Sequence, residues 1–350
     1  MSKLRRWRYL AFPAAGLAVL GALALGVGGQ SPGPAAGQQR LRLAYFPNVT
    51  HAPAVAGVAR GELQRGLPAG VVLDPKVFNA GPAEMEALLA GEVDVGYVGP
   101  SPAINTYLKS DGRALRLLAG ACSGGAALVA RADVGIAGIR DLDGKRVAVP
   151  QLGGTQDVSA RHFLAQNGLR PREKGGTVEV VPITNPDILS LFVRRQLDAA
   201  WVPEPWAARL VKEAGARLVV DERDLWPGRQ FTTTVVVVRT AFLEQHAPLV
   251  EALLQGHLHS IDWLQQHPDE GQTVVNAELK RLTSKELPAE VLREAWSRVE
   301  FTADPNRSSI ESFVRAAADA GYLPQQPLDV AGLFHLHPLE RARRTLAAAR

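Results

Sequence analysis

The stretch EALLAGEVDVGYVGPSPA, residues Glu86–Ala103, decides how this chain can fold, because the chain contains a second copy of it. The second copy is SLFVRRQLDAAWVPEPWA, residues Ser190–Ala207, and the two align without a gap. Each copy ends an amphipathic helix, runs through a short apolar strand and meets a pair of prolines, which are tolerated in the first turn of a new helix. A unit that occurs only twice, far apart in the chain, predicts two similar lobes rather than a solenoid.

The remaining sequence alternates strands with helices, which predicts an α/β fold. We expect each lobe to contain a mostly parallel sheet flanked by helices. Residues 126–131 and 232–239 are apolar stretches that we interpret as two crossing strands between the lobes. The predicted first lobe consists of residues 41–124 and 232–350, and the predicted second lobe of residues 126–228.

Residues 1–37 have the layout of an export signal or an N-terminal tether. Basic residues precede an uncharged run, residues 9–29, and the small, turn-forming residues SPGPAAG follow. The uncharged run is long for a signal core and just long enough to span a bilayer, so a cleaved signal and an uncleaved anchor both stay open. The chain has a single cysteine, Cys122, and therefore no lipid-attachment cysteine after the signal. We expect an exported protein that is not a lipoprotein.

The composition is that of a soluble globular protein, with 46% hydrophobic and 21% charged residues in a chain of 350. Four of the 39 Lys and Arg residues lie in residues 1–37, so the remaining 35 balance the 35 Asp and Glu residues. A neutral body argues against a nucleic-acid partner, which would favour a basic surface.

Four predicted strand-to-helix turns carry the candidate binding groups: residues 48–53, 99–102, 153–157 and 203–206. In an open α/β sheet the ligand lies beyond the carboxyl ends of the strands, where helix N-termini offer unpaired N–H groups and favour an anion. Two turns come from each predicted lobe, which indicates a cleft between the lobes.

The expected ligand-binding residues follow these turns and the Ser-Gly step after the fourth strand. They are Asn48, Thr50, His51, Ser101, Ser123, Gly124, Gly154, Thr155, Gln156, Glu204 and Trp206. Hydroxyls and N–H groups would bind an anionic end, with His51 at the rim. Glu204 would accept an ammonium or N–H group of the ligand, and Trp206 and Trp226 would form a pocket wall.

No catalytic motif accompanies these binding groups. The sequence contains no GxSxG elbow, P-loop or HExxH, and Cys122 has no evident base beside it. The histidine pairs at 257 and 259 and at 335 and 337 have the wrong spacing for a helical metal site. We therefore expect no catalytic residue, no metal and no cofactor.

Several motifs together resemble the aliphatic sulfonate, nitrate and taurine solute-binding proteins of ABC importers. They are THAPA (residues 50–54), FNAGP (78–82), GEVDVGYVGPSP (91–102), DLDGKRVAVP (141–150) and WVPEPW (201–206). The resemblance covers roughly residues 41–322 and implies the two-lobed, type II periplasmic binding protein fold. One departure is that the matched motifs at the predicted cleft turns contain no arginine, so an anion would have to rely on backbone N–H groups, Ser and Thr.

The resemblance implies an extracytoplasmic, monomeric binding protein that captures a small anionic or zwitterionic solute and delivers it to membrane permease subunits. An organosulfonate such as an alkanesulfonate or taurine is the expected solute, with nitrate or a thiamine-precursor pyrimidine as alternatives. An enzyme of the related pyrimidine synthase branch is a further alternative, although that branch relies on a cysteine cluster. A regulator built on the same lobes would need a helix-turn-helix domain, which the sequence lacks.

Overall fold

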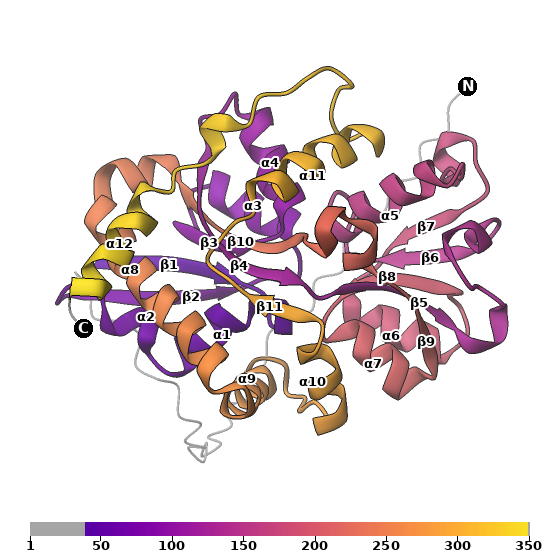
Figure 1. Cartoon of the computed structure of the whole chain (residues 1–350), viewed down its shortest axis with the longest axis horizontal. Helices are drawn as coiled ribbons and strands as arrows, with labels where there is room; N and C mark the ends of the chain where they lie inside the picture. The colour runs from indigo at the N-terminus through magenta and orange to yellow at the C-terminus, as the bar shows by residue number, and fades with distance from the viewer. Residues whose placement is uncertain (1–38, 349–350) are drawn as a thin grey trace, which may run out of the picture. The chain divides into compact units, whose positions relative to one another are not determined.

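Two separate β-sheets organise residues 39–348, the part of the chain that the computed structural model describes (Figure 1). The predicted export signal, residues 1–37, lies outside the described residues. Figure 1 shows the two sheets side by side, with helices on both faces of each. The strands of one sheet come from both ends of the described chain, and those of the other come from its middle.

The first sheet has six strands in the order β11-β4-β10-β3-β1-β2. Its strands are β1 (Gln39–Tyr45), β2 (Val71–Val77), β3 (Val95–Val98), β4 (Leu115–Gly124), β10 (Thr232–Arg239) and β11 (Val299–Phe301). Strand β1 pairs in parallel with β2 and β3. Strand β10 is antiparallel to both of its neighbours, β3 and β4, and β11 is antiparallel to β4.

The second sheet has five strands in the order β7-β6-β8-β5-β9. Its strands are β5 (Ala126–Arg131), β6 (Arg146–Val149), β7 (Glu179–Pro182), β8 (Ala199–Pro203) and β9 (Ala216–Asp221). Strand β6 pairs in parallel with β7 and β8, and β5 is antiparallel to β8 and β9.

Most strands of each sheet run in one direction, as predicted, but each sheet contains one reversed strand in its interior. These two strands, β5 and β10, are the stretches that the sequence suggested as crossings between lobes. Both are apolar and buried along almost their whole length, as expected for a strand with both faces covered. The chain instead passes between the sheets at Gly125 and again through residues 222–231.

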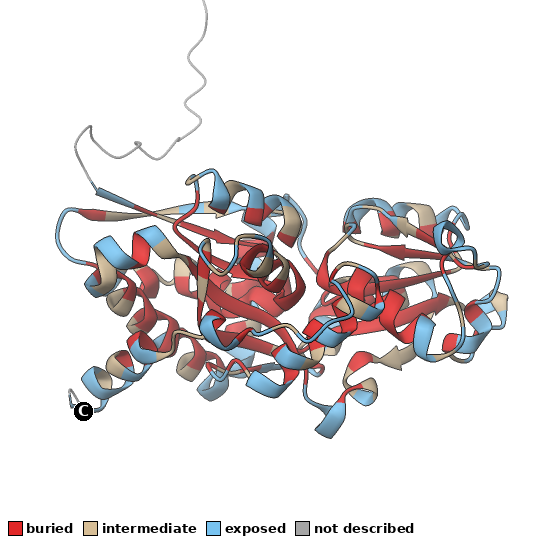
Figure 2. Cartoon of the chain, turned by 90° about the horizontal axis from the view of Figure 1, so that it is seen from above, coloured by how far each residue is buried: buried red, intermediate tan, exposed pale blue. Residues whose placement is uncertain are grey.

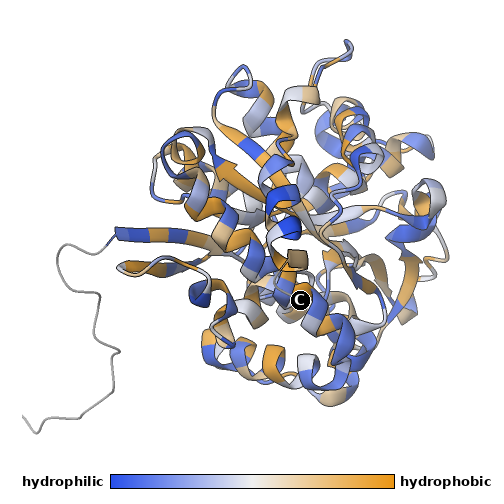
Figure 3. Cartoon of the chain, turned by 60° about the vertical axis from the view of Figure 1, so that its left-hand side comes forward, coloured by the Kyte–Doolittle hydropathy of each residue, from blue (hydrophilic) through white to orange (hydrophobic). Residues whose placement is uncertain are grey.

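Twelve helices of the described residues cover the sheets, and their alternating polar and apolar stripes are visible in Figure 3. They are α1 (Ala52–Ala59), α2 (Glu62–Arg65), α3 (Gly81–Leu89), α4 (Pro100–Lys109), α5 (Thr155–Gln166), α6 (Asn185–Val193), α7 (Trp206–Ala214), α8 (Thr240–Gln266), α9 (Pro268–Thr283), α10 (Ala289–Trp296), α11 (Arg307–Asp319) and α12 (His337–Ala348). Within residues 39–348, none of these helices has the length and apolar character needed to cross a membrane.

Three hydrophobic cores result from this layering, and Figure 2 shows that the strands of both sheets are largely buried. The largest joins one face of both sheets, where α3, α4, α5 and α11 contribute side chains. A second core lies between the first sheet and α1, α8 and α9, and a third between the second sheet and α6 and α7.

The C-terminal helices contact both halves of the molecule. Helix α10 packs against α7 and α9, and α11 packs against α4 and α5. The assignment of all residues from 232 to 350 to one lobe stays a prediction, as do the other lobe boundaries.

The duplicated stretch forms the same structure twice. Helix α3 spans residues 81–89 and α6 spans residues 185–193. Each helix is followed by an interior strand of its sheet, β3 after α3 and β8 after α6. Tyr97 and Trp201, which occupy equivalent positions in the two strands, are both fully buried. Their burial agrees with the prediction that the two copies build equivalent parts of two sheets.

An aspartate just before the strand makes the same hydrogen bonds in both copies. Asp94 accepts from the backbone N–H of Arg42 at 3.0 Å, and Asp198 accepts from that of Arg146 at 2.9 Å. The aspartate backbones reciprocate by donating to the carbonyls of the same arginines at 2.9 and 3.0 Å. Each aspartate carbonyl also accepts from a third strand, β10 or β5. One residue therefore joins the start of the central strand to both neighbours.

Asp94 is the more strongly held of the two carboxylates. Its side chain is 1% exposed and pairs with the guanidinium groups of Arg42 at 2.5 Å and Arg239 at 3.0 Å. Burial by itself would raise the pKa of Asp94, but the hydrogen bonds from Arg42 and Arg239 outweigh it and hold the pKa below its ordinary value. The carboxylate is therefore ionised at neutral pH and contributes to the stability of the first sheet.

We expect Asp94→Asn to lower the free energy of unfolding by about 1 to 3 kcal/mol, because it leaves two partly buried guanidinium groups without their counter-charge. Urea unfolding followed by circular dichroism measures this difference. The matched control is Asp111→Asn, since Asp111 pairs with Arg113 where both side chains are more than 80% exposed and such pairs contribute little. Equal effects of the two substitutions would contradict the role assigned to Asp94.

Candidate functional site

A cavity lies between the two sheets, at the end where the strands lead into helices. Its volume is about 40 Å³. A single water requires about 10 to 15 Å³, so the cavity suits a small solute group. It is lined by Phe46, Asn48, Thr50, His51, Asn79, Ala80, Gly81, Gly99, Pro102, Pro150, Gln151, Gly154, Thr155, Gln156, Asn185, Pro203 and Thr233.

Five helices begin at the wall of this cavity. The wall residues at these N-termini are the N-cap residues of α1, α4 and α5 (His51, Gly99 and Gly154) and the first residues of α3 and α6 (Gly81 and Asn185). Each N-terminus presents backbone N–H groups that have no partner within the helix, and each carries the positive end of a helix dipole. The wall therefore has a positive potential without a formal charge.

The described residues that line the cavity include no Asp, Glu, Lys or Arg. The one titratable group is His51, whose side chain is buried, and burial lowers the pKa of this histidine to about 3. The Phe46 backbone N–H donates to His51 Nδ1 at 3.3 Å, so the neutral ring carries its proton on Nε2. His51 is a neutral hydrogen-bond donor in this wall, not a cation.

Several polar atoms of the wall have no hydrogen-bond partner among residues 39–348. They are Thr155 Oγ1, Asn185 Oδ1 and Gln151 Oε1. Thr155 and Asn185 are 5% and 7% exposed, and buried polar groups without partners are costly unless a ligand or water satisfies them. The hydroxyl of Thr155 also lies so close to Gly99 that a Cβ at position 99 would collide with it. These features are those of a site built to contact a bound group.

The turn that carries Thr155 is fixed from behind by a buried aspartate. Asp157 accepts from the backbone N–H of Gly153 at 2.8 Å, from Arg161 Nε at 2.7 Å and from the hydroxyl of Tyr322. Gly153 has φ of 74°, which favours glycine at this position. Because Tyr322 follows α11, the C-terminal part of the chain helps to position the cavity wall.

The structure brings together six of the eleven predicted binding residues: Asn48, Thr50, His51, Gly154, Thr155 and Gln156. It does not place Ser101, Ser123 or Gly124 on the cavity wall. Ser101 is fully buried within α4, and the hydroxyl of Ser123 donates to the Phe231 carbonyl at 3.1 Å. The carbonyl of Gly124 accepts from the hydroxyl of Thr233, so Gly124 positions a residue of the cavity wall without lining the cavity itself.

The two tryptophans predicted for the pocket wall have different positions. Trp206 lies beside the cavity, where its Nε1 donates to Asn48 Oδ1 at 2.9 Å. Trp226 is 6% exposed and packs against Phe163, Phe231 and Phe313 in the largest core. The prediction that Trp226 lines the pocket is wrong, because its ring completes an aromatic cluster.

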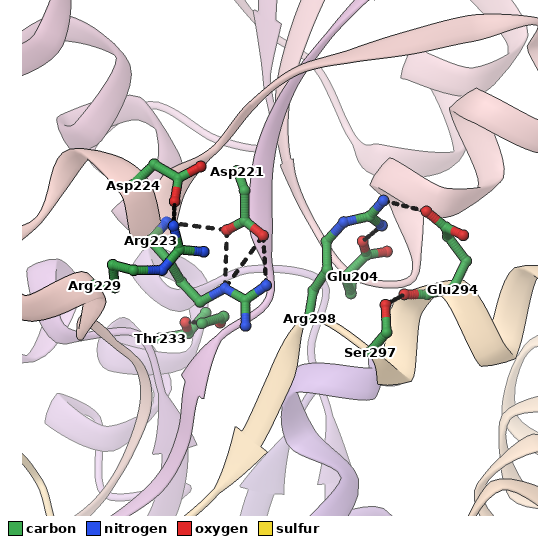
Figure 4. A network of polar contacts seen from close by, with 10 residues as sticks. Glu204, Asp221, Arg223, Asp224, Arg229, Thr233, Glu294, Ser297 and Arg298 are labelled. Carbon is green, nitrogen blue, oxygen red and sulfur yellow. Dashed lines mark hydrogen bonds and ion pairs between the residues drawn. The ribbon is translucent and has the colours of Figure 1, made fainter.

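Glu204 does not line the cavity, although the sequence suggested it as a ligand-binding carboxylate. It is fully buried, and Figure 4 shows it facing Arg298, whose Nη1 lies 2.6 Å from its Oε1. The backbone N–H of Ala208 donates to the other oxygen at 3.0 Å. Burial raises the pKa of Glu204 above its ordinary value, while Arg298 and this N–H oppose that rise. Its carboxylate is engaged by the protein itself.

Several wall residues were not among the predicted binding residues, most clearly Asn79, Gln151, Asn185 and Thr233. One signal could have identified Asn185. It is the first residue of α6 and aligns with Gly81, the first residue of α3, in the duplicated unit. The duplication therefore places Gly81 and Asn185 at equivalent turns, although neither turn was among the four predicted to line the cleft.

The described chain has the fold of the type II periplasmic binding proteins, with two mixed sheets and a cavity between them. The alkanesulfonate-binding protein SsuA from Xanthomonas axonopodis pv. citri, solved with MOPS bound, superposes with a TM-score of 0.67 at 22% identity, covering 83% of this chain and 96% of that one. The nitrate-binding protein NrtA from Synechocystis PCC 6803 superposes with a TM-score of 0.72 at 15% identity, covering 89% of each chain. These likenesses confirm the predicted fold class.

The chain belongs to the NMT1-like family, whose pattern matches residues 34–278, more than half of the chain. It is also similar to the taurine-binding periplasmic protein of Escherichia coli K12, with 28% identity over 214 residues. That match spans 61% of this chain and 64% of the relative, slightly less than two thirds of the relative's length. The resemblance to the sulfonate, nitrate and taurine-binding proteins is confirmed.

We expect Glu204→Gln to destabilise the protein by about 1 to 3 kcal/mol and to leave its ligand preference unchanged, because it removes the buried partner of Arg298. Urea unfolding and a ligand panel measure the two effects. Glu311→Gln is the control, since Glu311 lies 3.9 Å from Arg307 at an exposed site. A changed ligand preference at unchanged stability would show that Glu204 binds the ligand and has no structural role.

Proposed function

We propose that this protein is the solute-binding component of an ABC importer, and that it binds a small anion, an organosulfonate, in the cavity between the two sheets. The observation that carries the proposal is the convergence of five helix N-termini on a wall without charged side chains. Such a wall favours an anion through N–H groups and helix dipoles. The sulfonate and taurine-binding proteins among the relatives support this class of solute.

Nitrate is the second candidate. The cavity is small, and a planar anion of four heavy atoms would fit a wall that offers hydrogen-bond donors from several directions.

The solute would be bound without being transformed. Chemistry on an acyl or sulfonyl group needs a nucleophile and a base within hydrogen-bond reach. Among the described residues that line the cavity, the strongest candidate base is His51, and the hydroxyl groups of the wall, those of Thr50, Thr155 and Thr233, are not hydrogen-bonded to its ring. Cys122 is buried, and burial raises the pKa of its thiol well above the ordinary value, so it is not a thiolate.

The proposal includes export and a membrane partner. The relatives are periplasmic binding proteins, and we propose the same extracytoplasmic location and delivery of the solute to permease subunits. Because the wall takes residues from both halves of the molecule, we propose that the halves move apart to admit the solute and together to hold it. We propose residues 41–124 with 232–350 and residues 126–228 as the parts that move, with α10 and α11 sliding over their contacts with α7 and α5.

We expect Gln156→Glu to weaken the binding of methanesulfonate, taurine and nitrate by at least about a hundredfold. The substitution keeps the side-chain shape but adds a negative charge to the cavity wall, where it repels an anion. Isothermal titration calorimetry gives the dissociation constants. Gln266→Glu adds the same charge at the exposed end of α8 and should leave them unchanged. If wild-type protein binds none of these anions below millimolar concentration, the proposed solute class is wrong.

The affinity for methanesulfonate should change less than about twofold between pH 6 and pH 8. Methanesulfonate stays ionised throughout this range, and the pKa of His51, lowered to about 3, keeps the ring neutral at both ends of it. A histidine with an ordinary pKa would instead become cationic as the pH falls through about 6.5 and would strengthen anion binding. Calorimetry at three pH values measures this, and tenfold tighter binding at pH 6 would show that His51 binds as a cation.

A further inference from the structure

A fully buried carboxyl group lies at the start of residues 222–231, the crossing segment, where the chain passes between the sheets for the second time. It belongs to Glu222, whose exposure is 0%. Glu222 does not line the cavity, so it takes no part in the proposed binding of a solute. A titratable group at this place can make the attachment of the crossing segment sensitive to pH.

Two tryptophans donate hydrogen bonds to this carboxyl group. Trp201 Nε1 lies 2.6 Å from Glu222 Oε2, and Trp226 Nε1 lies 3.1 Å from Glu222 Oε1. Both indole rings are buried. Trp201 lies on β8, an interior strand of the second sheet, whereas Trp226 belongs to the crossing segment. The carboxyl group therefore joins the crossing segment to the second sheet.

The arginines of the crossing segment are engaged by other carboxylates. Arg223 pairs with Asp221 at 2.6 Å, and Arg229 pairs with Asp224, as Figure 4 shows. Among the described residues, the hydrogen bonds to Glu222 come from the two neutral indoles, and no ion pair involves it. A buried negative charge without a cationic partner is costly.

Glu204 provides a contrast within the same molecule. It is as fully buried as Glu222, but Arg298 Nη1 lies 2.6 Å from its Oε1. A guanidinium group compensates the negative charge of Glu204, whereas neutral donors alone face Glu222. Of the two buried carboxyl groups, Glu222 is therefore the one for which a bound proton replaces the missing cation.

His162 is a second titratable group beside the same indoles. Its ring stacks on Trp226 with the centroids 6.1 Å apart, and its Nδ1 lies 2.9 Å from Asp319 Oδ2. Burial lowers the pKa of His162. The other charged groups on the elements around Glu222 are Arg131 on β5, Asp157 and Arg161 on α5, Arg217 on β9 and Arg315 on α11. Any pH titration of the tryptophans has to separate Glu222 from His162.

The sign of the proton linkage follows from burial. Burial raises the pKa of Glu222 from 4.5 to about 7, although the indole N–H groups oppose this rise, and the adjacent Asp221 adds to it. The folded chain then binds this proton more tightly than the unfolded chain does. The resulting stabilisation is fully present below pH 4.5 and is lost as the pH rises to about 7.

We propose that Glu222 is a proton-binding switch at the second crossing between the sheets. Its carboxyl group takes up a proton as the solution becomes acidic and releases it as the solution becomes alkaline. Release leaves a buried negative charge between Trp201 and Trp226 and weakens the attachment of the crossing segment to the second sheet. The switch goes beyond the proposed function and does not depend on it. Because Glu222 lies outside the cavity wall, we do not expect the solute affinity to follow this proton.

The first test is nuclear magnetic resonance of the full chain labelled with ¹⁵N at its six tryptophans. The indole N–H signals of Trp201 and Trp226 should move together with a midpoint at a pH of about 7, because their shared acceptor changes its charge. Glu222→Gln, which carries no charge at any pH, should abolish this movement. Trp263 is the internal control, since its ring stacks on the exposed His267 and should titrate alike in both proteins.

The second test is urea unfolding at unit steps from pH 5 to pH 9. The folding equilibrium constant of the wild type, divided by that of Glu222→Gln, should fall by about tenfold for each pH unit between pH 5 and pH 7 and stay level above about pH 8. Asp224→Asn is the matched control, because Asp224 lies in the same segment at an exposed position. Its ratio to the wild type should not depend on pH.

Two results would overturn the switch. If the signals of Trp201 and Trp226 do not move between pH 5 and pH 9, Glu222 keeps one protonation state and the proposal is wrong. If the movement persists in Glu222→Gln and disappears in His162→Gln, the proton belongs to His162. Circular dichroism shows whether the variants fold, and the titration of the wild-type signals decides the first point even if Glu222→Gln does not.

Discussion

The architecture depends on the hydrogen bonds of one aspartate at the start of a strand in each sheet, a buried one in the first sheet and a half-buried one in the second. Asp94 and Asp198 each join three strands, because a single residue binds one neighbour through its side chain and amide and the other through its carbonyl. The aspartates lie at the ends of β3 and β8 that are remote from the cavity. The opposite ends of the same strands lead directly into the turns that line it. The strand register that the aspartates fix at one end of β3 and β8 therefore determines the position of the cavity-lining turns at the other end.

The framework of sheets and helices orients hydrogen-bond donors around the cavity although the described residues of its wall carry no formal charge. Backbone N–H groups are held by helices, helices are held by the sheets, and each donor is oriented before a ligand arrives. Thr155 is a clear instance, since Asp157, Tyr322 and the close approach of Gly99 leave its hydroxyl little freedom. The absence of a carboxylate from the described wall matters as much, because one such group would cancel the potential of several helix termini.

Local sequence patterns were sufficient to predict most helices and strands and six of the residues that line the cavity. Asn48, His51, Gly154 and Thr155 could be predicted because they sit at strand-to-helix turns, and the position of such turns follows from chain order in an α/β sheet. The duplication likewise predicted α3 and α6.

Strand direction and partner choice could not be predicted in the same way. The sequence of β10 predicts a buried strand but not its direction. Its direction, antiparallel to both β3 and β4, follows from its place between them in the sheet. The sequence around Glu204 suggested a free carboxylate, because its partner, Arg298, lies 94 positions further along the chain. Arg298 follows α10, which packs against both halves, so no local pattern connects it to Glu204.

The neutral wall of the cavity also has a kinetic consequence. A charged cleft accelerates the arrival of its ligand by long-range attraction, and this acceleration weakens as ionic strength rises. Dipoles at helix ends act only within the first turn or so and attract little from a distance. The encounter with an anion should therefore proceed at an ordinary diffusive rate that salt hardly alters, with selectivity residing in how slowly the bound solute escapes.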